Sequence, residues 1–557
     1  MATSTACPDW RERILSGRSL VPPPLHADEA DISLDIFKSL RIADIPGCPT
    51  MGESCNEWIF DTVRSVFGAY DGATGRRDIS EWLISVSKKN FKSGLAAGIM
   101  MTALIRNWRE SAEYGILAPT VEVANNSFFP ARDMIRKDEE LSDLFQVQDH
   151  IRTITHRTSR ATLKVIAAEN ETVGGKKFTG VLFDELWLFG KRPNAGDMMR
   201  EATGGLASRP EGFVISLTTM SNEAPAGVFK QKLDYARQVR DGKIADPKFV
   251  PILYEFPESM LADKSCRDPK NWHITNPNMG ASVDMARLRS LHQQAEAAGE
   301  EELIGFFAKH VNVEVGLAMQ SDRWPGADFW DACAVERIEL DELLERSDVV
   351  DVGIDGGGLD DLLGLSVLGR DRNTGKWLLW ARAWAHPSVL ERRKSEAARF
   401  KDFARDGDLI LVKNIGDDVI EVAEIVEQVE NSGKLDKVGV DPHGLGGILD
   451  ALVEIGVPQD KVIGISQGWK MSGAIKTAER RVAEGNFEHS GSPMMRWCVG
   501  NAKVEPRGNA VIITKQASGY AKIDPLLATF NAVSLMSLVP EAAGKSFWDK
   551  PVAQPSA

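Results

Sequence analysis

The residues Gly180-Val181-Leu182-Phe183-Asp184-Glu185-Leu186-Trp187 indicate the architecture around which the rest of the chain is built. Their apolar run is typical of a short strand buried on both faces, as in the middle of a parallel sheet. The two carboxylates cannot stay inside a sheet, so we expect them at the strand's carboxyl end, where open α/β sheets bind ligands. There Asp184 could hold a Mg²⁺ ion that bridges phosphates, and Glu185 could orient or deprotonate an attacking water. The alternative is a solvated strand end that is merely acidic.

Length and composition restrict the class of protein. A chain of 557 residues is too long for one hydrophobic core, so two or three domains are expected. No window is apolar enough to span a membrane, and the N-terminus lacks a signal-peptide pattern. The six cysteines contain no C-x-x-C pair, which fits a reducing cytosol. The net charge of −14 (66 − 80) argues against a protein that coats nucleic acid over its whole surface, but it allows one local basic channel.

A strand at Trp82–Val86 is followed by a basic loop and an Ala-rich helix. The order strand, loop, Lys-Ser, helix is that of a phosphate-binding P-loop. Here Lys92 would reach the β- and γ-phosphates, and Ser93 would bind Mg²⁺. The glycine positions of G-x-x-x-x-G-K-[ST] fall at Val86 and Phe91, and neither is glycine. Taken alone, a Lys-rich surface loop is an equally good interpretation.

Further strands follow at α/β spacing, at Tyr114–Ala118, Leu163–Ala167 and Phe213–Leu217. The hydroxyls of Thr218 and Thr219 then suit either a sensor of the γ-phosphate or caps of the next helix. Five strands with helices between them, an early Lys-Ser and a central Asp-Glu together predict an α/β P-loop NTPase core.

Three aspartates in the second half end or open separate elements. Asp355 follows the first strand of a predicted three-stranded meander, Asp441 ends a later strand, and Asp524 opens a final apolar helix. Two Mg²⁺ or Mn²⁺ ions roughly 3.5–4 Å apart need carboxylates from separate elements that converge on one edge. This order of elements predicts an RNase H-like nuclease, although each aspartate alone is explained as a helix cap or turn residue.

The predicted domains are an N-terminal helical segment, the ATPase core, a linker or lid subdomain, the nuclease domain and a tail. Their expected bounds are 1–80, 81–225, 226–345, 346–540 and 541–557.

From about residue 20 to 540 the chain resembles the large terminase subunit of tailed bacteriophages, a DNA-packaging ATPase and endonuclease. Residues 88–93 resemble its Walker A sequence, in which the first glycine is often absent, so Phe91 is the one clear departure. Residues 183–185 resemble its Walker B strand and 216–219 its coupling motif. Further matches are Ala118-Pro119-Thr120, Trp272 with Asn276-Pro277, Phe306–Asn312, Gln467-Gly468, Trp497 with Asn501, and Lys522–Pro525.

The resemblance implies an ASCE-type ATPase domain, which binds ATP with Mg²⁺, followed by a nuclease domain with two Mg²⁺ or Mn²⁺ ions. The implied ATP-binding residues are Lys88, Lys89, Asn90, Lys92, Ser93 and Asp184. The implied coupling residues are Ser216, Thr218 and Thr219. The implied catalytic residues are Glu185, Asp355, Asp441 and Asp524, of which the three aspartates are the metal ligands.

The resemblance also implies translocation of viral double-stranded DNA into a procapsid and cleavage of concatemeric DNA. The expected partners are the portal protein, a small terminase subunit, an HNH endonuclease in some relatives, and further copies of the chain in a pentameric ring. No membrane is involved, and the expected location is the cytoplasm of the infected bacterial host, outside the mature virion.

Two other interpretations stay open. One is an RNase H-like nuclease whose N-terminal domain binds nucleotide without hydrolysing it, and the other is a capsid-docking adaptor that has lost both sites. The first depends on Phe91, because an aromatic residue at positive φ is strained. We expect the loop to avoid this strain by another path, with Phe91 turned into the core and Lys92 and Ser93 still in place. The candidate arginine fingers are Arg132, Arg136, Arg152, Arg157 and Arg160, and the sequence does not rank them.

Overall fold

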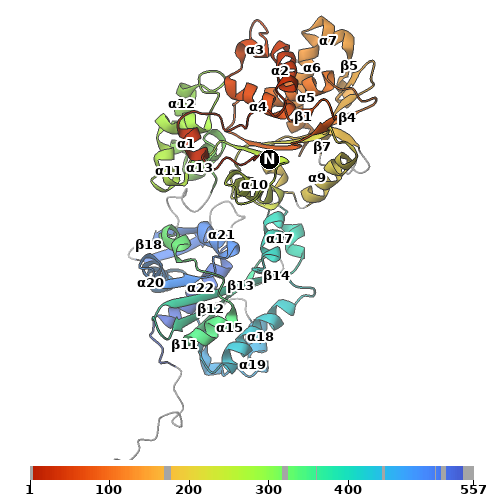
Figure 1. Cartoon of the computed structure of the whole chain (residues 1–557). Helices are drawn as coiled ribbons and strands as arrows, with labels where there is room; N and C mark the ends of the chain where they lie inside the picture. Colours follow the sequence, from red (N-terminus) through yellow and green to blue (C-terminus); the bar gives the residue numbers. More distant parts are fainter. Residues whose placement is uncertain are drawn as a thin grey trace, which may run out of the picture. The chain divides into compact units, whose positions relative to one another are not determined.

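The computed structural model divides into two compact units, Met1–Gly316 and Leu317–Ala557, both drawn in Figure 1. The structure describes residues 4–167, 177–192, 194–315, 324–358, 361–394, 396–441, 446–507, 510–515 and 522–542. Within these ranges no helix has the length and apolar character needed to cross a membrane.

The first unit is built on an eight-stranded sheet. Its order is β10 (Phe249–Leu253), β3 (Glu81–Ser85), β9 (Phe213–Thr218), β8 (Phe178–Phe183), β4 (Glu113–Ala118), β7 (Thr162–Ala167), β6 (Thr153–His156) and β5 (Phe145–Gln148). The strands from β10 to β7 are parallel, β6 is antiparallel to β7, and β5 is antiparallel to β6. Every residue of β8 and β9 is buried. Because β9 lies between β3 and β8, the predicted ASCE-type P-loop NTPase fold is confirmed.

The N-terminal helices pack tightly against this core. Helix α2 (Ala27–Ser39) contacts α4 (Glu57–Phe67) and α5 (Lys92–Ile105). A Cβ added at Gly98 of α5 would lie 2.3 Å from the ring of Phe37, so this ring packs directly on the α5 backbone. The other helices of this unit are α1 (Trp10–Leu15), α3 (Met51–Ser54), α6 (Val121–Arg136), α7 (Glu139–Leu144), α8 (Leu186–Phe189), α9 (Ala195–Gly204), α10 (Gly227–Arg240), α11 (Glu258–Ala262), α12 (Met285–Ala298) and α13 (Glu300–His310).

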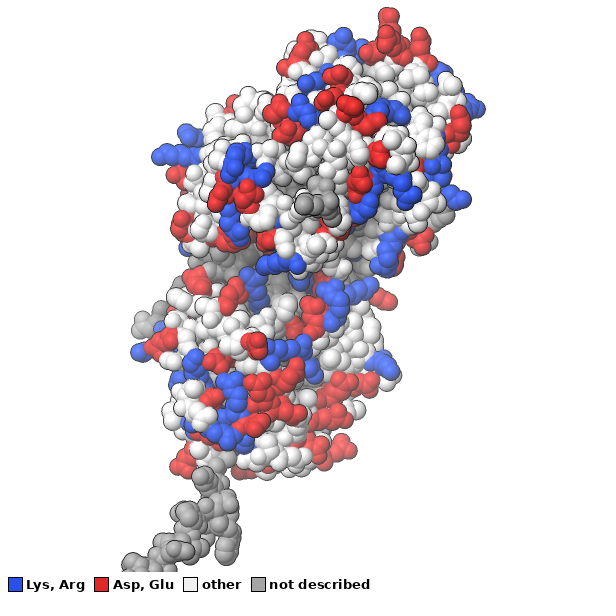
Figure 2. Space-filling model, viewed as in Figure 1, with Lys and Arg blue, Asp and Glu red and all other residues white. Residues whose placement is uncertain are grey.

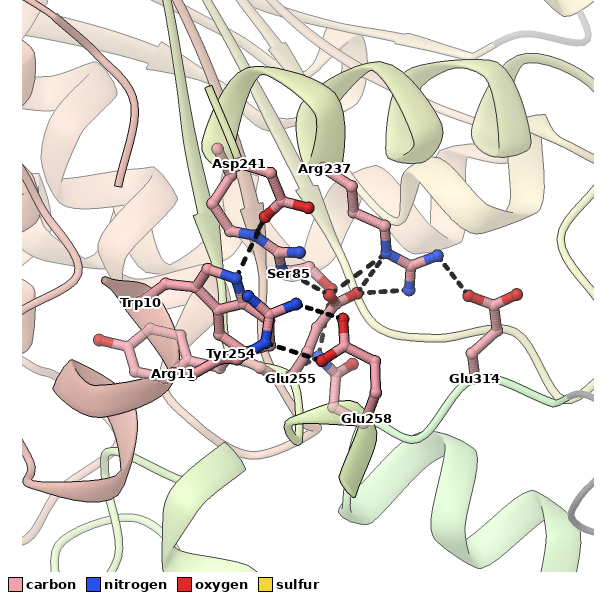
Figure 3. A network of polar contacts seen from close by, with 11 residues as sticks. Trp10, Arg11, Ser85, Arg237, Asp241, Tyr254, Glu255, Glu258 and Glu314 are labelled. Atoms are coloured by element: carbon pink, nitrogen blue, oxygen red, sulfur yellow. Dashed lines mark hydrogen bonds and ion pairs between the residues drawn. The ribbon is translucent and has the colours of Figure 1, made fainter. Parts of the chain in front are cut away.

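A network of polar contacts, drawn in Figure 3, fastens α1 to α11 through Arg11 and Glu258, and α10 to the residues after β10 through Glu255. Glu255 is buried and binds the guanidinium groups of Arg237 (2.6 Å) and Arg240 (2.9 Å). Arg240 in turn lies 3.9 Å from the ring centroid of Trp10. The two guanidinium groups hold the pKa of Glu255 below its ordinary value, although burial alone would raise it. The N-terminal segment is therefore part of the first unit.

Residues 226–345, for which the sequence predicts a linker or lid, are divided between the two units. They supply β10 to the first sheet, and α14 (Ala327–Trp330) and α15 (Leu340–Arg346) to the second unit. The sequence pattern does not reveal β10 as a strand because Pro251 interrupts it. A proline is tolerated there because β10 is at the edge of the sheet.

The second unit contains the predicted meander. Strands β11 (Ser347–Gly356), β12 (Leu363–Asp371) and β13 (Trp377–Ala385) are antiparallel neighbours, and β15 (Leu435–Val440) runs parallel to β11. The sheet is completed by β14 (Leu409–Leu411), β16 (Val462–Gly464) and β17 (Phe487–His489), and β18 (Ala502–Arg507) forms a separate hairpin with β19 (Ala510–Lys515). The remaining helices are α16 (Ser388–Arg392), α17 (Ala397–Arg405), α18 (Asp417–Asn431), α19 (Gly446–Glu454), α20 (Ser472–Ala483), α21 (Pro493–Asn501) and α22 (Asp524–Met536).

Small residues let α22 lie directly on the meander. A Cβ at Gly353 of β11 would come 1.9 Å from the carbonyl oxygen of Ala528. A Cβ at Gly364 of β12 would come 2.7 Å from the Cα of Pro525. This close approach brings the first residue of α22, Asp524, beside the carboxyl end of β11.

Candidate functional sites

The loop after β3 keeps a left-handed residue where a P-loop has glycine. Phe91 has φ +64° and ψ +21° and directly precedes α5. The expectation of another path is therefore wrong. The Phe91 ring covers Gly94, where an added Cβ would come 2.3 Å from the ring, and the side chain is half-buried rather than in the core. This packing offsets a backbone strain of about 1–3 kcal/mol.

Lys92 and Ser93 open α5, as the sequence predicts. The Nζ of Lys92 donates to the carbonyl oxygens of Val86 and Ser87, both at 3.2 Å. Burial lowers the pKa of Lys92, and the charges of Glu185 and Asp184 oppose this shift. The amine of Lys92 thus lies inside the loop and interacts with both carboxylates of the acidic pair.

Asn90 attaches the loop to the segment 275–278. Its amide nitrogen donates to Oδ1 of Asn276 at 2.8 Å, and its Oδ1 accepts the backbone N–H of Asn278 at 3.0 Å. The side chain is fully buried. The side chain of Asn90 therefore ties the loop to the segment 275–278. Lys88 and Lys89 directly precede Asn90 in the loop.

Asp184 and Glu185 follow β8 at its carboxyl end. Asp184 is buried, and its Oδ2 accepts a hydrogen bond from the hydroxyl of Ser127 at 2.8 Å. Burial and the charge of Glu185 raise the pKa of Asp184 to about 6. Glu185 has φ +53° and accepts a hydrogen bond of 2.5 Å from the indole N–H of Trp187. The sequence gives no signal for Ser127, which reaches this site from α6.

The predicted coupling residues lie on β9, the strand beside β8, and directly after it. Thr218 Oγ1 accepts the backbone N–H of Trp187 at 3.2 Å and donates to the carbonyl oxygen of Thr219 at 2.8 Å. The hydroxyls of Ser216 and Thr219 are buried and have no hydrogen-bond partner in the described part of the chain. The hydroxyl of Thr218 therefore connects β9 to the residues that follow the acidic pair.

Asn312 is a site residue that sequence reasoning names only as part of a linker motif. Its Oδ1 accepts the backbone N–H of Met220 at 2.9 Å. Its amide nitrogen donates to Ser85 Oγ at 3.2 Å and to the carbonyl oxygen of Tyr254 at 2.8 Å. One buried side chain thus joins the ends of β3, β9 and β10.

Three of the candidate arginine fingers are engaged within the chain. Arg132 and Arg136 both bind Asp149, and Arg152 donates to Oδ1 of Asn125 at 2.9 Å. These contacts do not single out one arginine as a finger.

The three predicted nuclease aspartates line one cavity of about 350 Å³ in the second unit. Asp355 lies near the end of β11, Asp441 directly follows β15, and Asp524 begins α22. The other lining residues are Gly356, Gly357, Gln467, Gly468, Met471, Ile475, Ile513 and Leu527. The sheet edge and α22 therefore bring together the carboxylates that the sequence places on separate elements.

Gln467 orients the first of these carboxylates. Its side-chain nitrogen donates to Asp355 Oδ1 at 3.3 Å and to Asn531 Oδ1 at 3.2 Å. Asn531 in turn donates to the carbonyl oxygen of Ile354 at 2.8 Å. These bonds link Asp355 to α22.

Carboxylate oxygens around a polar cavity are suitable ligands for hard divalent cations. Within the described ranges, no three His, Cys, Asp or Glu side chains are close enough together to hold a single ion. Residues 442–445, which follow Asp441, lie outside the described residues. The carboxylate oxygens of Asp355, Asp441 and Asp524 are the type of ligand that divalent cations prefer, and these three residues would hold the metal.

Two family models match the chain in tandem. The model "Terminase large subunit, ATPase domain" matches residues 57–238, and the model "Terminase large subunit, endonuclease domain" matches residues 246–538.

Individual proteins match as well. The large terminase subunit of Enterobacteria phage HK97 is 25% identical over 481 residues, which cover 83% of this chain and 86% of that protein. Protein YmfN of Escherichia coli strain K12 is 23% identical over 341 residues, covering 59% and 72%. The crystal structure of the HK97 large terminase covers 91% of this chain and 99% of its own, at 19% identity and a TM-score of 0.46. A large terminase from a thermophilic bacteriophage covers 84% and 95%, at 13% identity and a TM-score of 0.31.

Proposed function

The chain belongs to the terminase large subunit family, and we propose which of its residues perform the two reactions of that family. It carries an ATPase domain and an endonuclease domain, and it acts in the packaging and cleavage of DNA. The observation that carries the residue assignment is that Lys92, at the start of α5 after β3, interacts with Asp184 and Glu185 at the carboxyl end of β8, with only β9 between the two strands.

In the ATPase domain, Lys92 and Ser93 bind the nucleotide phosphates and Mg²⁺, and Asp184 holds the same ion. Bound ATP supplies the phosphoanhydride bond that is broken. Lys92 gives up its bonds to the loop carbonyls in exchange for phosphate oxygens, a charge-assisted contact that is stronger than the one it loses. Lys88 and Lys89 add positive charge to the loop, and Asn90 keeps the loop in shape.

Glu185 orients the attacking water and accepts its proton. Its carboxylate is fixed by the indole N–H of Trp187, and the backbone N–H of Trp187 is bound to Thr218. Thr218 is therefore linked to Glu185 through Trp187, and Ser216 and Thr219 lie beside it on β9 and directly after that strand. We propose that Ser216, Thr218 and Thr219 couple ATP hydrolysis to the movement of DNA.

In the nuclease domain, Asp355, Asp441 and Asp524 are the residues that would hold two Mg²⁺ or Mn²⁺ ions next to the scissile phosphodiester of DNA. Bound metal supplies Lewis acidity for the attacking and leaving oxygens. Gln467 keeps Asp355 turned into the cavity. Acidic side chains gather where α18 lies in Figure 2, so a DNA duplex approaches the second unit on another face.

The domain bounds and partners complete the proposal. We propose that the first unit, Met1–Gly316, is the ATPase domain, with the helical segment 1–80 and strand β10 as parts of it, and that the second unit, from Leu317 onward, is the nuclease domain. The protein works on viral double-stranded DNA as a pentameric ring on the portal protein of the procapsid. A small terminase subunit, and in some systems an HNH endonuclease, act with it in the cytoplasm of the infected bacterial host. Cross-linking of purified chain to portal rings, with and without DNA, tests the assembly.

Phe91→Gly is expected to bind ATP at least as tightly as the natural chain. The substitution relieves a strained φ but loses the ring contact with Gly94, so the net change is small. Lys92→Ala, in contrast, loses roughly ten- to a hundredfold in affinity, because a charged hydrogen bond contributes about 1.5–3 kcal/mol. Titration of a non-hydrolysable ATP analogue against the three proteins measures this.

The contrary result would be that the natural chain binds the ATP analogue no better than Lys92→Ala does, while Phe91→Gly restores binding. The loop would then be degenerate, and the first unit would be a scaffold that holds nucleotide poorly.

A further inference from the structure

Lys309 lies where several parts of the ATPase site meet, although it belongs to α13 in the segment expected to be a linker. Its Nζ donates to the carbonyl oxygen of Met220, which follows the coupling residues, at 2.8 Å. Its backbone carbonyl accepts the N–H of Lys88 in the phosphate loop at 2.7 Å. The side chain of Lys309 is about nine-tenths buried, so it is packed inside the site rather than exposed at its edge.

The same amine packs on the residue that holds Glu185. Lys309 Nζ lies 3.0 Å from the centroid of the Trp187 ring, and the indole N–H of Trp187 donates to Glu185 Oε2 at 2.5 Å. The three side chains therefore form a continuous series of contacts from α13 to the carboxylate. This close packing of the amine against the face of the indole restricts the plane of the ring, and thereby the direction of its N–H.

The surroundings of Lys309 set the protonation state of its amine. Burial lowers the pKa of Lys309 to about 6, and Lys88, Lys191 and Lys92 act in the same direction. Glu185 acts in the opposite direction and favours the charged amine. At neutral pH the amine of Lys309 is therefore largely uncharged, and it acts on Trp187 by packing and through its hydrogen bond to Met220.

We propose that Lys309 is a positioning residue for ATP hydrolysis, which acts through Trp187 to hold the carboxylate of Glu185 in the direction of the attacking water. This inference rests on the proposed function of Glu185. Lys309 also connects Glu185 to Met220 and Lys88, so the α13 segment takes part in setting the geometry of the reaction.

The test is a set of variants assayed for ATP turnover and for affinity toward a non-hydrolysable ATP analogue. Lys309→Met removes the amine, and Trp187→Phe keeps a ring but removes the N–H donor. Each is expected to lower kcat roughly ten- to a hundredfold, the cost of a misplaced catalytic group, while the analogue Kd stays within about threefold. Because both act on Glu185 through one series of contacts, the double variant is expected to be no slower than the slower single variant.

Lys191→Met is the matched control. Lys191 also lies over the Trp187 ring, but at 5.4 Å, and it is held by Glu223 at 2.6 Å. Its kcat is expected to stay within about twofold of the natural chain, since the contact of Lys309 with Trp187 is unchanged and a half-exposed ion pair contributes little.

Three outcomes would overturn the inference: natural turnover in Lys309→Met, a parallel loss of analogue binding, or effects of the two substitutions that multiply. If Lys309→Met does not fold, Trp187→Phe with natural turnover is equally decisive against it. Glu185→Gln, assayed alongside, distinguishes a failure of the proposed role of Glu185 from a failure of the role of Lys309 alone. An active Glu185→Gln contradicts the proposed function itself, whereas an inactive Glu185→Gln beside an active Lys309→Met contradicts only the role of Lys309.

Discussion

Glu185→Gln is expected to lose ATP hydrolysis while it keeps ATP binding. The amide has the shape of the carboxylate but cannot accept a proton from water, and general-base catalysis contributes roughly 10²- to 10⁴-fold to rates. Binding persists because Lys92, Ser93 and Asp184 are unchanged. Release of inorganic phosphate measures turnover, and titration of an ATP analogue measures binding.

Plasmid cutting in the presence of Mg²⁺ or Mn²⁺ is the control for Glu185→Gln. It is expected to continue at the natural rate, because the nuclease aspartates belong to the other compact unit. Hydrolysis at the natural rate by Glu185→Gln would show that another group is the catalytic carboxylate.

The central strands and their acidic ends could be predicted from the sequence because the signal is local. The apolar run Val181–Phe183 is typical of a buried strand, and Asp184 and Glu185 must then leave the sheet at its carboxyl end. The same logic places Asp355 and Asp441 at one edge of the second sheet, since β11 and β15 are parallel neighbours. A strand direction and a polar residue at its end are enough for such a prediction.

Contacts between distant segments could not be predicted in this way. Asn90 meets Asn276 and Lys309 meets Met220 only because the chain folds back, and no periodicity records such a meeting. Strand β10 was not predicted for another reason. Pro251 interrupts its sequence pattern, but an edge strand tolerates a proline.

Phe91 illustrates a different limit. The steric argument that an aromatic residue avoids positive φ is correct as a tendency, but it considers the backbone alone. The structure leaves the strain in place and packs the ring on Gly94, a residue with no Cβ to obstruct it. The loop therefore keeps its path, and the position of Lys92 follows from that path.

Asp355→Asn is expected to remove most DNA cutting and to leave ATP hydrolysis unchanged. Asp355 lies near the end of the first strand of the meander and is turned into the cavity by Gln467, so it is the best placed to contact both ions. Loss of a shared metal ligand costs several kcal/mol of transition-state stabilisation, or roughly a hundredfold or more in rate. Asp441→Asn and Asp524→Asn are also expected to cut poorly, with partial recovery at high Mn²⁺ where one ion still binds. Conversion of supercoiled plasmid to nicked and linear forms measures all three.

Asp351→Asn provides a matched control for the same substitution on the same strand. Asp351 is fully buried on β11, accepts the backbone N–H of Lys437 at 3.2 Å, and is not among the residues that line the cavity. Burial and the charge of Asp436 raise the pKa of Asp351 to about 8, so at neutral pH the side chain carries a proton and asparagine resembles it closely. We therefore expect Asp351→Asn to cut DNA at the natural rate. Equal losses in Asp351→Asn and Asp355→Asn would mean that the substitutions disturb β11 as a whole. Natural cutting by Asp355→Asn would contradict the assignment of this cavity as the nuclease centre, because Asp355 lines it together with Asp441 and Asp524.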